Sequence, residues 1–194
     1  MPRPRDEDAA RRIVEAASTL IAECGPAAAS ISEIAAAAEV GRQTIYRWWP
    51  SRSALVIDAL VQMTDASMPY RSTGDIEADL RAHMRSVIRA FAGPAGALIK
   101  ELVADGQREP EVADAFRAAF FDHRRDQARA FIAAAVERGE ISADLDVDAV
   151  VYSLYAPLWL ALLIGHEPLT NRTADRALDA VLRSELIAAG SSTR

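Results

Sequence analysis

The residues of this sequence that are best suited to recognition chemistry lie close together, between Val40 and Ile57. This segment contains three arginines and no acidic residue, although the whole chain carries a net charge of −6. Arginine can form two parallel hydrogen bonds with guanine, glutamine can do the same with adenine, and threonine or aromatic carbon can contact the thymine methyl group. The segment therefore has the composition of a reader of DNA base edges. Its candidate DNA-facing residues, of which Tyr46 is also suited to phosphate, are Arg42, Gln43, Thr44, Tyr46, Arg47 and Trp48.

Phosphate contacts are expected from the residues that follow. Ser51 and Arg52 carry a hydroxyl and a guanidinium, which bind phosphate oxygens and fix docking rather than sequence choice. Arg3 and Arg5, in the polar N-terminal arm, could follow a minor groove or belong to a solvated tail. The polar residues of the segment could also be the solvated face of a structural helix pair. An exposed tyrosine and tryptophan on one short helix argue instead for a contact surface.

Two short helices joined by a tight turn must hold these residues in place. Ser30 and Glu33 have the spacing of a capping box, in which each side chain satisfies a free backbone N–H at the start of a helix. Ile45 and Trp49 are four residues apart, so they can share the buried face of the second helix. Pro50 ends that helix, because the residue before a proline is disfavoured in the helical conformation. The segment is therefore predicted to be a helix-turn-helix.

The sequence EIAAAAEVGRQTIYRWWPSRSALV closely resembles the signature of the TetR family of transcriptional regulators. The upstream segment VEAASTLIAECG resembles that family's first helix, and the resemblance extends over residues 9–60. It assigns residues 42–44 and 46–48 to DNA, and residues 51–52 to phosphate. Two positions depart from the family's pattern. Gly41 replaces a frequent Ser or Thr helix cap, so one possible phosphate-contacting hydroxyl is missing, and Pro26 replaces a frequent aromatic residue.

The rest of the chain is also predicted to be helical. Alanine is abundant, glycine and proline number nine each, and alternating β-branched runs are missing, which favours an all-α fold of about nine helices. Residues 1–52 form the predicted DNA-binding head, linked through a helix at residues 51–66 to a ligand-binding and dimerisation bundle at residues 67–194. Other helices are expected at residues 8–24, 75–91, 95–105, 110–138, 147–164 and 173–189.

The charges are distributed unevenly. Residues 1–53 contain seven basic and seven acidic side chains, so the remaining 15 basic and 21 acidic groups supply the whole net charge of −6. The acidic part therefore lies outside the predicted DNA reader. The single cysteine, Cys24, fits a reducing compartment and is expected to be inert. The charged N-terminal residues do not resemble a signal peptide, and no apolar run reaches the ~20 residues of a membrane span, so a cytoplasmic location is expected.

Two of the predicted helices suggest a homodimer. The helix at residues 147–164 is apolar on nearly every side and must therefore be buried on every side. The helix at residues 173–189 has its own apolar stripe. We expect both to pack against their copies in a second chain, in a two-fold, four-helix interface. Two recognition helices about 34 Å apart would then read a palindrome. The alternative is a thick core within a monomer.

Large apolar and aromatic residues of the central helices predict a pocket for a small hydrophobic or aromatic ligand. Such pockets combine an apolar lining with a few polar groups, which here could come from the histidines. The alternative is a solid core. The candidate lining residues are Met84, Val87, Phe91, Leu102, Phe116, Phe120, His123, Tyr152, Tyr155 and Trp159.

The sequence contains no pattern that predicts catalysis. His83, His123 and His166 lie far apart without paired ligands, and no G-x-S-x-G, P-loop or Rossmann glycine pattern occurs. No enzyme activity, metal or cofactor is therefore predicted. The pattern favours a homodimeric repressor that binds double-stranded DNA and is released by a small molecule. The alternative is an α-helical interaction or ligand-binding module that no longer binds DNA.

Overall fold

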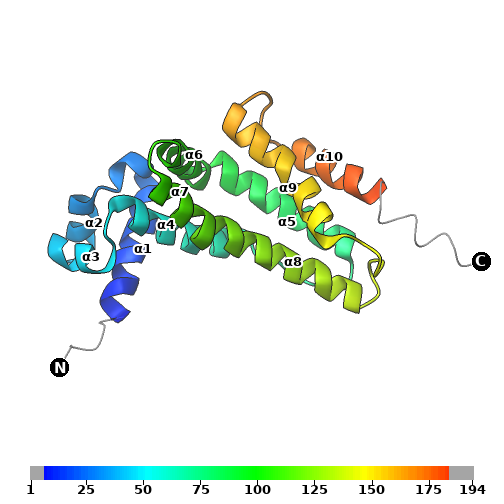
Figure 1. Ribbon diagram of the computed structural model, residues 1–194, viewed down its shortest axis with the longest axis horizontal. Helices are drawn as coiled ribbons and strands as arrows, with labels where there is room; N and C mark the ends of the chain where they lie inside the picture. Colours follow the sequence, from blue (N-terminus) through cyan, green and yellow to red (C-terminus); the bar gives the residue numbers. More distant parts are fainter. Residues whose placement is uncertain (1–6, 184–194) are drawn as a thin grey trace, which may run out of the picture. The chain divides into compact units, whose positions relative to one another are not determined.

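The chain folds into helices joined by short loops (Figure 1). The structure is a computed structural model that describes residues 7–183, and within this range it contains helical elements and no strand. The chain divides into two compact units. The first comprises residues 1–66 and 93–121, and the second comprises residues 67–92 and 122–194. The prediction of an all-α fold is confirmed.

The first unit begins with the predicted helix-turn-helix. Helix α1 packs against α2 and α3, and also against the 3-10 turn η1 and helix α6. Ile13, Ile34, Ile45 and Leu55 have no exposed surface and form the centre of this small core. The elements of the unit are α1 (Glu7–Cys24), η1 (Pro26–Ala28), α2 (Ile31–Ala37), α3 (Arg42–Trp48), α4 (Arg52–Ser67), α6 (Pro94–Gly106), α7 (Pro110–Phe116) and the π-helical turn η2 (Arg117–Phe121).

The second unit is a bundle in which α10 packs against both α5 and α9, and α9 also contacts α8. Its core includes Leu80, Met84, Leu154 and Leu158, which are buried. Arg81 of α5 forms ion pairs with Asp175 and Asp179 of α10, at 3.2 and 2.9 Å. The elements of this unit are α5 (Ile76–Ala92), α8 (Asp122–Glu137), α9 (Val147–Ile164) and α10 (Asn171–Val181).

Neither compact unit is continuous along the chain. Residues 93–121 belong to the same compact unit as the head. The reason is packing, because α6 contacts both α1 and η1. The helix predicted at residues 110–138 is a helical run interrupted by the π-turn η2. Near its start, Gly106 lies so close to α7 that an added Cβ would be 3.1 Å from the Ala113 backbone.

The apolar stripe of the last helix has a different role from the expected one. Ala174, Leu178 and Val181 are buried within the chain, since α5 and α9 cover that side of α10. The stripe therefore stabilises the bundle of a single chain. Residues 184–189 of the predicted helix, and Arg3 and Arg5 of the arm, lie outside the described residues.

Candidate functional site

Helix α3 is built to present one face outward. Ser30 and Glu33 form the predicted capping box at the start of α2, where the Ser30 Oγ accepts a hydrogen bond from the Glu33 backbone N–H at 3.2 Å. Ile45 is fully buried and Trp49 is 7% exposed, which confirms that these two residues share the buried face. Anchoring on this side leaves the opposite side of α3 open.

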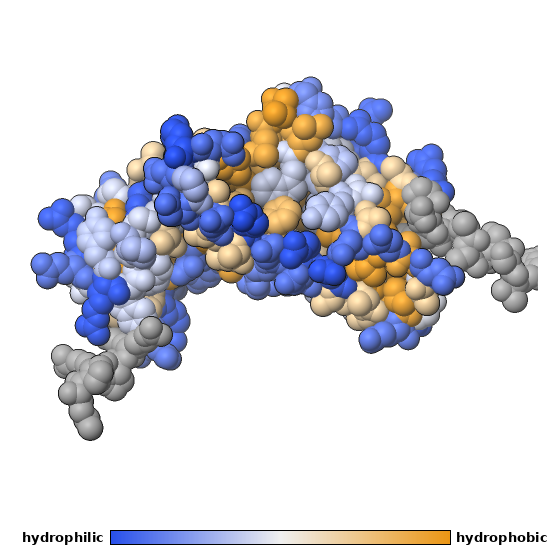
Figure 2. Space-filling view, viewed as in Figure 1, coloured by the Kyte–Doolittle hydropathy of each residue, from blue (hydrophilic) through white to orange (hydrophobic). Residues whose placement is uncertain are grey.

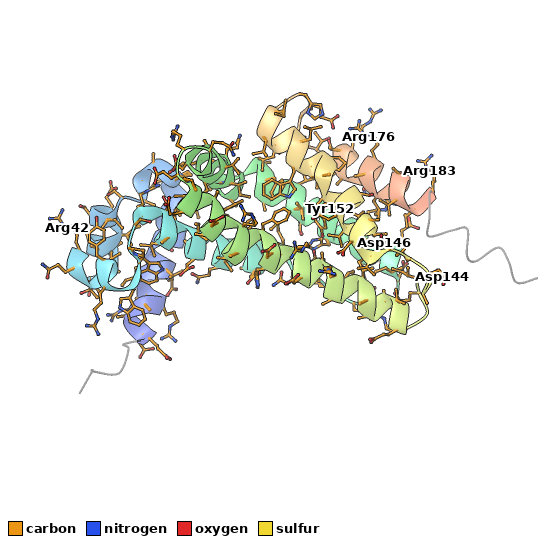
Figure 3. All side chains as sticks on the ribbon, viewed as in Figure 1. Arg42, Asp144, Asp146, Tyr152, Arg176 and Arg183 are labelled. Carbon is orange, nitrogen blue, oxygen red and sulfur yellow. The ribbon has the colours of Figure 1, made fainter. Side chains whose placement is uncertain are left out.

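The predicted DNA-facing residues of α3 gather on that open side. Four of them are exposed and two are half-buried. The exposed fraction of Tyr46, a large aromatic residue, is 53%. Arg42 points away from the neighbouring helices (Figure 3). The face therefore combines hydrogen-bond donors and an aromatic ring without a carboxylate. The exposed residues are Arg42, Gln43, Tyr46 and Arg47, and the half-buried ones are Thr44 and Trp48.

The back of α3 is fixed by a contact that the sequence pattern did not indicate. The indole N–H of Trp49 donates a hydrogen bond of 2.7 Å to Asp58 Oδ2 on α4. The ring of Trp48 stacks on Trp49, with centroids 6.1 Å apart. A carboxylate that accepts a buried indole N–H fixes the angle of the ring. Trp49 thus holds the end of α3 against α4 and sets the direction of its exposed face.

The two predicted phosphate-binding residues have different surroundings. Ser51 is exposed, and its Oγ accepts a hydrogen bond from the Ala54 N–H, so it caps the start of α4. Arg52 has internal partners instead. Its guanidinium donates to the carbonyl oxygens of Ala29 at 2.9 Å and Pro26 at 2.6 Å, and forms an ion pair of 2.5 Å with Glu101 of α6. A phosphate contact by Arg52 would compete with these three bonds.

The second unit contains a cluster of polar aromatic residues in its interior. Tyr70, in the segment between α4 and α5, stacks on His83 with ring centroids 3.8 Å apart and planes 15° apart. Its hydroxyl is 2.6 Å from that of Tyr155 on α9. His83 is 3% exposed, and burial lowers its pKa from 6.5 to about 4. Burial also raises the pKa of Tyr155 well above 10, so all three groups are neutral at physiological pH.

The predicted ligand-contacting residues are divided between the two units. Phe91 and Trp159 meet edge to face within the second unit, with centroids 5.5 Å apart. Tyr152 differs from the others, since it is 54% exposed on α9 and belongs to the surface of the chain. A cleft of about 270 Å³ lies in the first unit, between α6 and the segment formed by α7 and η2. Leu102, Phe116 and Phe120 belong to the first unit, whereas Met84, Val87, Phe91, His123, Tyr152, Tyr155 and Trp159 belong to the second.

One face of α9 is apolar and uncovered in the single chain. Its exposed residues fall on an arc of about 120° when drawn at 3.6 residues per turn. No charged residue lies on this arc, and apolar surface gathers over the C-terminal end of α9 (Figure 2). Within residues 7–183, α9 alone is long and apolar enough to cross a membrane, a property that core helices of soluble proteins share. The exposed residues are Ala149, Tyr152, Ser153, Ala156, Leu160, Leu163 and Ile164.

Comparison with known proteins agrees with this geometry. The family model described as "Bacterial regulatory proteins, tetR family" matches residues 13–59, which include the helix-turn-helix. The model described as "Tetracyclin repressor-like, C-terminal domain" matches residues 71–181, more than half of the chain. The chain belongs to the TetR family. Members of this family are DNA-binding transcriptional regulators rather than enzymes; they form dimers and often respond to small ligands.

Individual relatives match over most of the chain. An uncharacterized HTH-type transcriptional regulator, YdeS of Bacillus subtilis (strain 168), is 32% identical over 92% of this chain and 90% of its own length. The DNA-binding transcriptional repressor TetR of Mycobacteroides abscessus is 30% identical over 79% of this chain and 80% of its own. The crystal structure of the TetR family regulator SCO0332 superposes with a TM-score of 0.86, at 28% identity, over 91% of this chain and 97% of that one.

Proposed function

We propose that this member of the TetR family is a homodimeric repressor that binds a palindromic operator through α3 and leaves it when a small hydrophobic molecule binds. The observation that carries the proposal is the open face of α3, where exposed arginine, glutamine and tyrosine side chains surround a helix anchored from behind by Ile45 and Trp49. Such a face, on a fixed helix, matches what a major groove accepts.

The roles of the side chains follow from their position and chemistry. Arg42 and Gln43, at the start of α3, are placed to read base edges, as the first residues of a recognition helix do. Thr44 and Trp48 offer carbon to thymine methyl groups, and Tyr46, Arg47 and Ser51 offer donors to phosphate oxygens. We assign Arg52 to the protein's own framework because its guanidinium already has three partners.

A binding measurement at several salt concentrations tests this part of the proposal. DNA recovered from a random pool should contain an inverted repeat with half-site centres about one helical turn apart. Affinity for that DNA should fall steeply as salt rises, since each neutralised phosphate releases counterions. A helical module that no longer binds DNA would recover no common sequence, and that result would exclude the proposed function.

The uncovered face of α9 supports the homodimer. It is apolar along a helix about 27 Å long, and its small residues Ala149, Ser153 and Ala156 allow a second helix to approach closely. A two-fold axis would place this face against its own copy. The outer face of α10 is charged instead. Arg176 of α10 and Arg183, two residues beyond its end, point away from the bundle (Figure 3), so this face suits the polar rim of such an interface.

Substitution on α9 tests the dimer. Leu160→Glu places a carboxylate at the centre of the proposed interface and should convert a dimer at micromolar concentration into a monomer in sedimentation velocity experiments. Ala133→Glu, on an exposed position of α8, is the matched control and should leave the dimer intact. A wild-type chain that sediments as a monomer would contradict the interface.

The first unit also suggests how a ligand could influence the head. Glu101 of α6 pairs with Arg52, and its neighbours Leu102 and Val103 line the cleft of about 270 Å³. Arg52 in turn holds η1, which contacts α1. A shift of α6 would therefore displace the Arg52 guanidinium and change its hydrogen bonds to the carbonyl oxygens of Pro26 and Ala29, which precede the helix-turn-helix. Ligand-dependent release requires that the ligand prefer one arrangement of these elements over another.

A further inference from the structure

Tyr70 occupies an unusual position for a residue between two helices. Its ring lies inside the second unit, stacked on His83 of α5 and 5.1 Å from the ring of Phe131 on α8. The guanidinium carbon of Arg124 lies 5.6 Å from the centre of the same ring, and the Tyr70 hydroxyl meets that of Tyr155 on α9. Three helices therefore provide a complete set of contacts for one phenol ring.

His83 shows that Tyr70 does not satisfy every polar group around it. The Nδ1 atom of His83 lies 3.1 Å from the carbonyl oxygen of Pro69. A carbonyl oxygen only accepts hydrogen bonds, so Nδ1 carries the proton and Nε2 is left as an acceptor in the neutral ring. Nε2 is buried and has no hydrogen-bond partner. A buried acceptor without a donor is unfavourable, so a group that supplied an O–H or N–H there would be stabilised.

We propose that Tyr70 is a built-in plug in the effector site, and that the effector is a neutral hydroxylated aromatic molecule that replaces the phenol ring of Tyr70. The contacts that now hold the phenol ring of Tyr70 would hold the phenol ring of another molecule equally well. A ring stacked on His83 with one hydroxyl against Tyr155 would keep the contacts of Tyr70. A second O–H or N–H on a rotatable substituent of the same molecule can leave the plane of this ring and reach Nε2, whose lone pair lies in the plane of the imidazole.

The charges around the ring favour a neutral effector. Tyr155 and His83 are neutral, and the nearest cation, Arg124, donates hydrogen bonds to the carbonyl oxygen of Met68 at 2.9 Å and to Gln127 at 2.6 Å. A carboxylate would need to draw Arg124 away from both acceptors. A neutral phenol needs no such rearrangement, because the guanidinium already lies over the ring face, where a cation–π contact is favourable.

Displacement of Tyr70 would have a consequence for the preceding helix. Three consecutive residues are held in the second unit: the Met68 carbonyl by Arg124, the Pro69 carbonyl by His83 and the Tyr70 hydroxyl by Tyr155. Met68 directly follows Ser67, the last residue of α4. An effector that removes Tyr70 loosens this attachment at the end of α4. The inference therefore rests on the proposed ligand response, and gives it a chemical class and a site in the second unit that is distinct from the cleft of the first unit.

The test uses p-cresol, which is the side chain of tyrosine as a free molecule, and toluene, which lacks the hydroxyl. Both are titrated into the full-length wild type, Tyr70→Phe and Tyr70→Ala by calorimetry. The plug competes with p-cresol, so the wild type should bind it measurably, Tyr70→Phe about tenfold more tightly and Tyr70→Ala more tightly still. Toluene should bind Tyr70→Ala at least about tenfold more weakly than p-cresol does.

Control variants separate this site from a simple cavity. Phe120→Ala removes a buried ring from the first unit and should not gain p-cresol affinity. Tyr155→Phe keeps the shape of the site and should abolish the preference for p-cresol over toluene. It also keeps the test valid if Tyr70→Ala does not fold. Binding of p-cresol to Tyr70→Ala without any binding to the wild type at millimolar concentration would show cavity filling only and would overturn the proposal.

His83 is tested with 2-(hydroxymethyl)-4-methylphenol, which adds to p-cresol a hydroxyl on a rotatable carbon that can leave the plane of the ring. The wild type should prefer this hydroxymethyl compound to p-cresol by about tenfold, and His83→Leu should lose that preference while still binding p-cresol. If the wild type and His83→Leu showed the same preference for the second hydroxyl, His83 would not contact the effector. Operator binding by the same preparations is measured separately, so that failure of the effector site and failure of the proposed DNA-binding function give different results.

Discussion

The face of α3 and the Tyr70 cluster contain similar side chains in opposite arrangements. On α3, arginine, glutamine and tyrosine point outward, and the protein's own contacts lie behind them. In the cluster, tyrosine, histidine and arginine turn inward and contact one another, and His83 Nε2 is left as a buried atom without a partner. Exposed polar side chains without internal partners indicate that an external molecule binds them. Polar side chains that contact one another inside the fold indicate the chemistry of a molecule that could replace one of them.

Arg52 shows why the comparison must be made atom by atom. It directly follows the proposed DNA-reading segment and has the residue type of a phosphate contact, yet its three bonds go to Ala29, Pro26 and Glu101. By environment it belongs with the inward-facing cluster, although by sequence it belongs with the recognition helix. Pairs of residues that are alike in type and different in environment therefore separate the two regions experimentally.

The largest effect is expected within α3 itself, from its two kinds of aromatic residue. Trp49→Ala removes a buried indole and its hydrogen bond to Asp58, and should lower the free energy of unfolding by about 3–5 kcal/mol. Tyr46→Ala, on the exposed side, should change it by less than about 0.5 kcal/mol and weaken operator binding instead. Urea unfolding and a DNA titration measure both quantities. Equal stability losses would show that the two faces of α3 are not distinct.

The outward face of α3 could be predicted largely from the sequence because its signals are local. The capping box at Ser30 and the four-residue spacing of Ile45 and Trp49 act within one or two turns, and α1 and α4 begin within one residue of the expected positions. The residue types on the remaining arc then follow from helical periodicity alone. Asp58 carries no such signal, since its bond to Trp49 depends on how α4 packs on α3.

The inward-facing contacts could not be predicted because their partners are distant in sequence. Arg52 meets a carboxylate 49 residues away, and Tyr70 meets a hydroxyl 85 residues away. Tyr70 also lies in a segment without helical periodicity, where an aromatic residue gives no indication of its burial. The stripe of α10 suggests an interface for a second chain, because the sequence does not show that α5 and α9 cover it.

A pH titration distinguishes the inward-facing cluster from the rest of the molecule. The folded-state pKa of His83 is about 4, below the ordinary 6.5, because burial disfavours the imidazolium and Arg124 adds repulsion. The unfolded chain therefore binds more protons than the folded chain between these values. Stability contributed by neutral His83 should be complete above pH 6.5 and fall by up to about 3 kcal/mol as the pH approaches 4.

His83→Leu should remove this slope of unfolding free energy against pH, measured by urea unfolding at a fixed protein concentration. His166→Leu is the matched control, because His166 is exposed and should leave most of the slope unchanged. The hydrogen bonds from Arg85 and Arg81 hold the pKa of Asp175 below its ordinary 3.8. Protonation of Asp175 therefore lowers the unfolding free energy only below pH 3.8, outside the range in which His83 acts. A slope that persists in His83→Leu between pH 6.5 and 4 would show that another group causes it.

A smaller effect, about 1–3 kcal/mol, is expected in DNA affinity when Arg42 is replaced by alanine. The loss should fall on the operator and much less on random DNA, because a base contact discriminates between sequences and a phosphate contact does not. Arg47→Ala is the comparison within the same helix and should weaken both kinds of DNA alike. An equal loss of affinity for operator and random DNA in Arg42→Ala would show that Arg42 contacts phosphate and does not read bases.

The smallest effect should come from Glu101→Gln, and it decides where Arg52 belongs. If Arg52 supports the head from within, removing the charge of its partner should cost about 0.5–1 kcal/mol of unfolding free energy, because the pair is partly exposed and two carbonyl bonds remain. Arg52→Lys keeps the positive charge but cannot form three forked bonds. It should destabilise the head while leaving the slope of log affinity against log salt unchanged. Because one lost phosphate contact changes that slope by about 0.9, Arg52→Ala offers the complementary measurement. If Arg52→Ala lowers the magnitude of that slope by about 0.9 with little loss of stability, Arg52 contacts phosphate and does not mainly support the head.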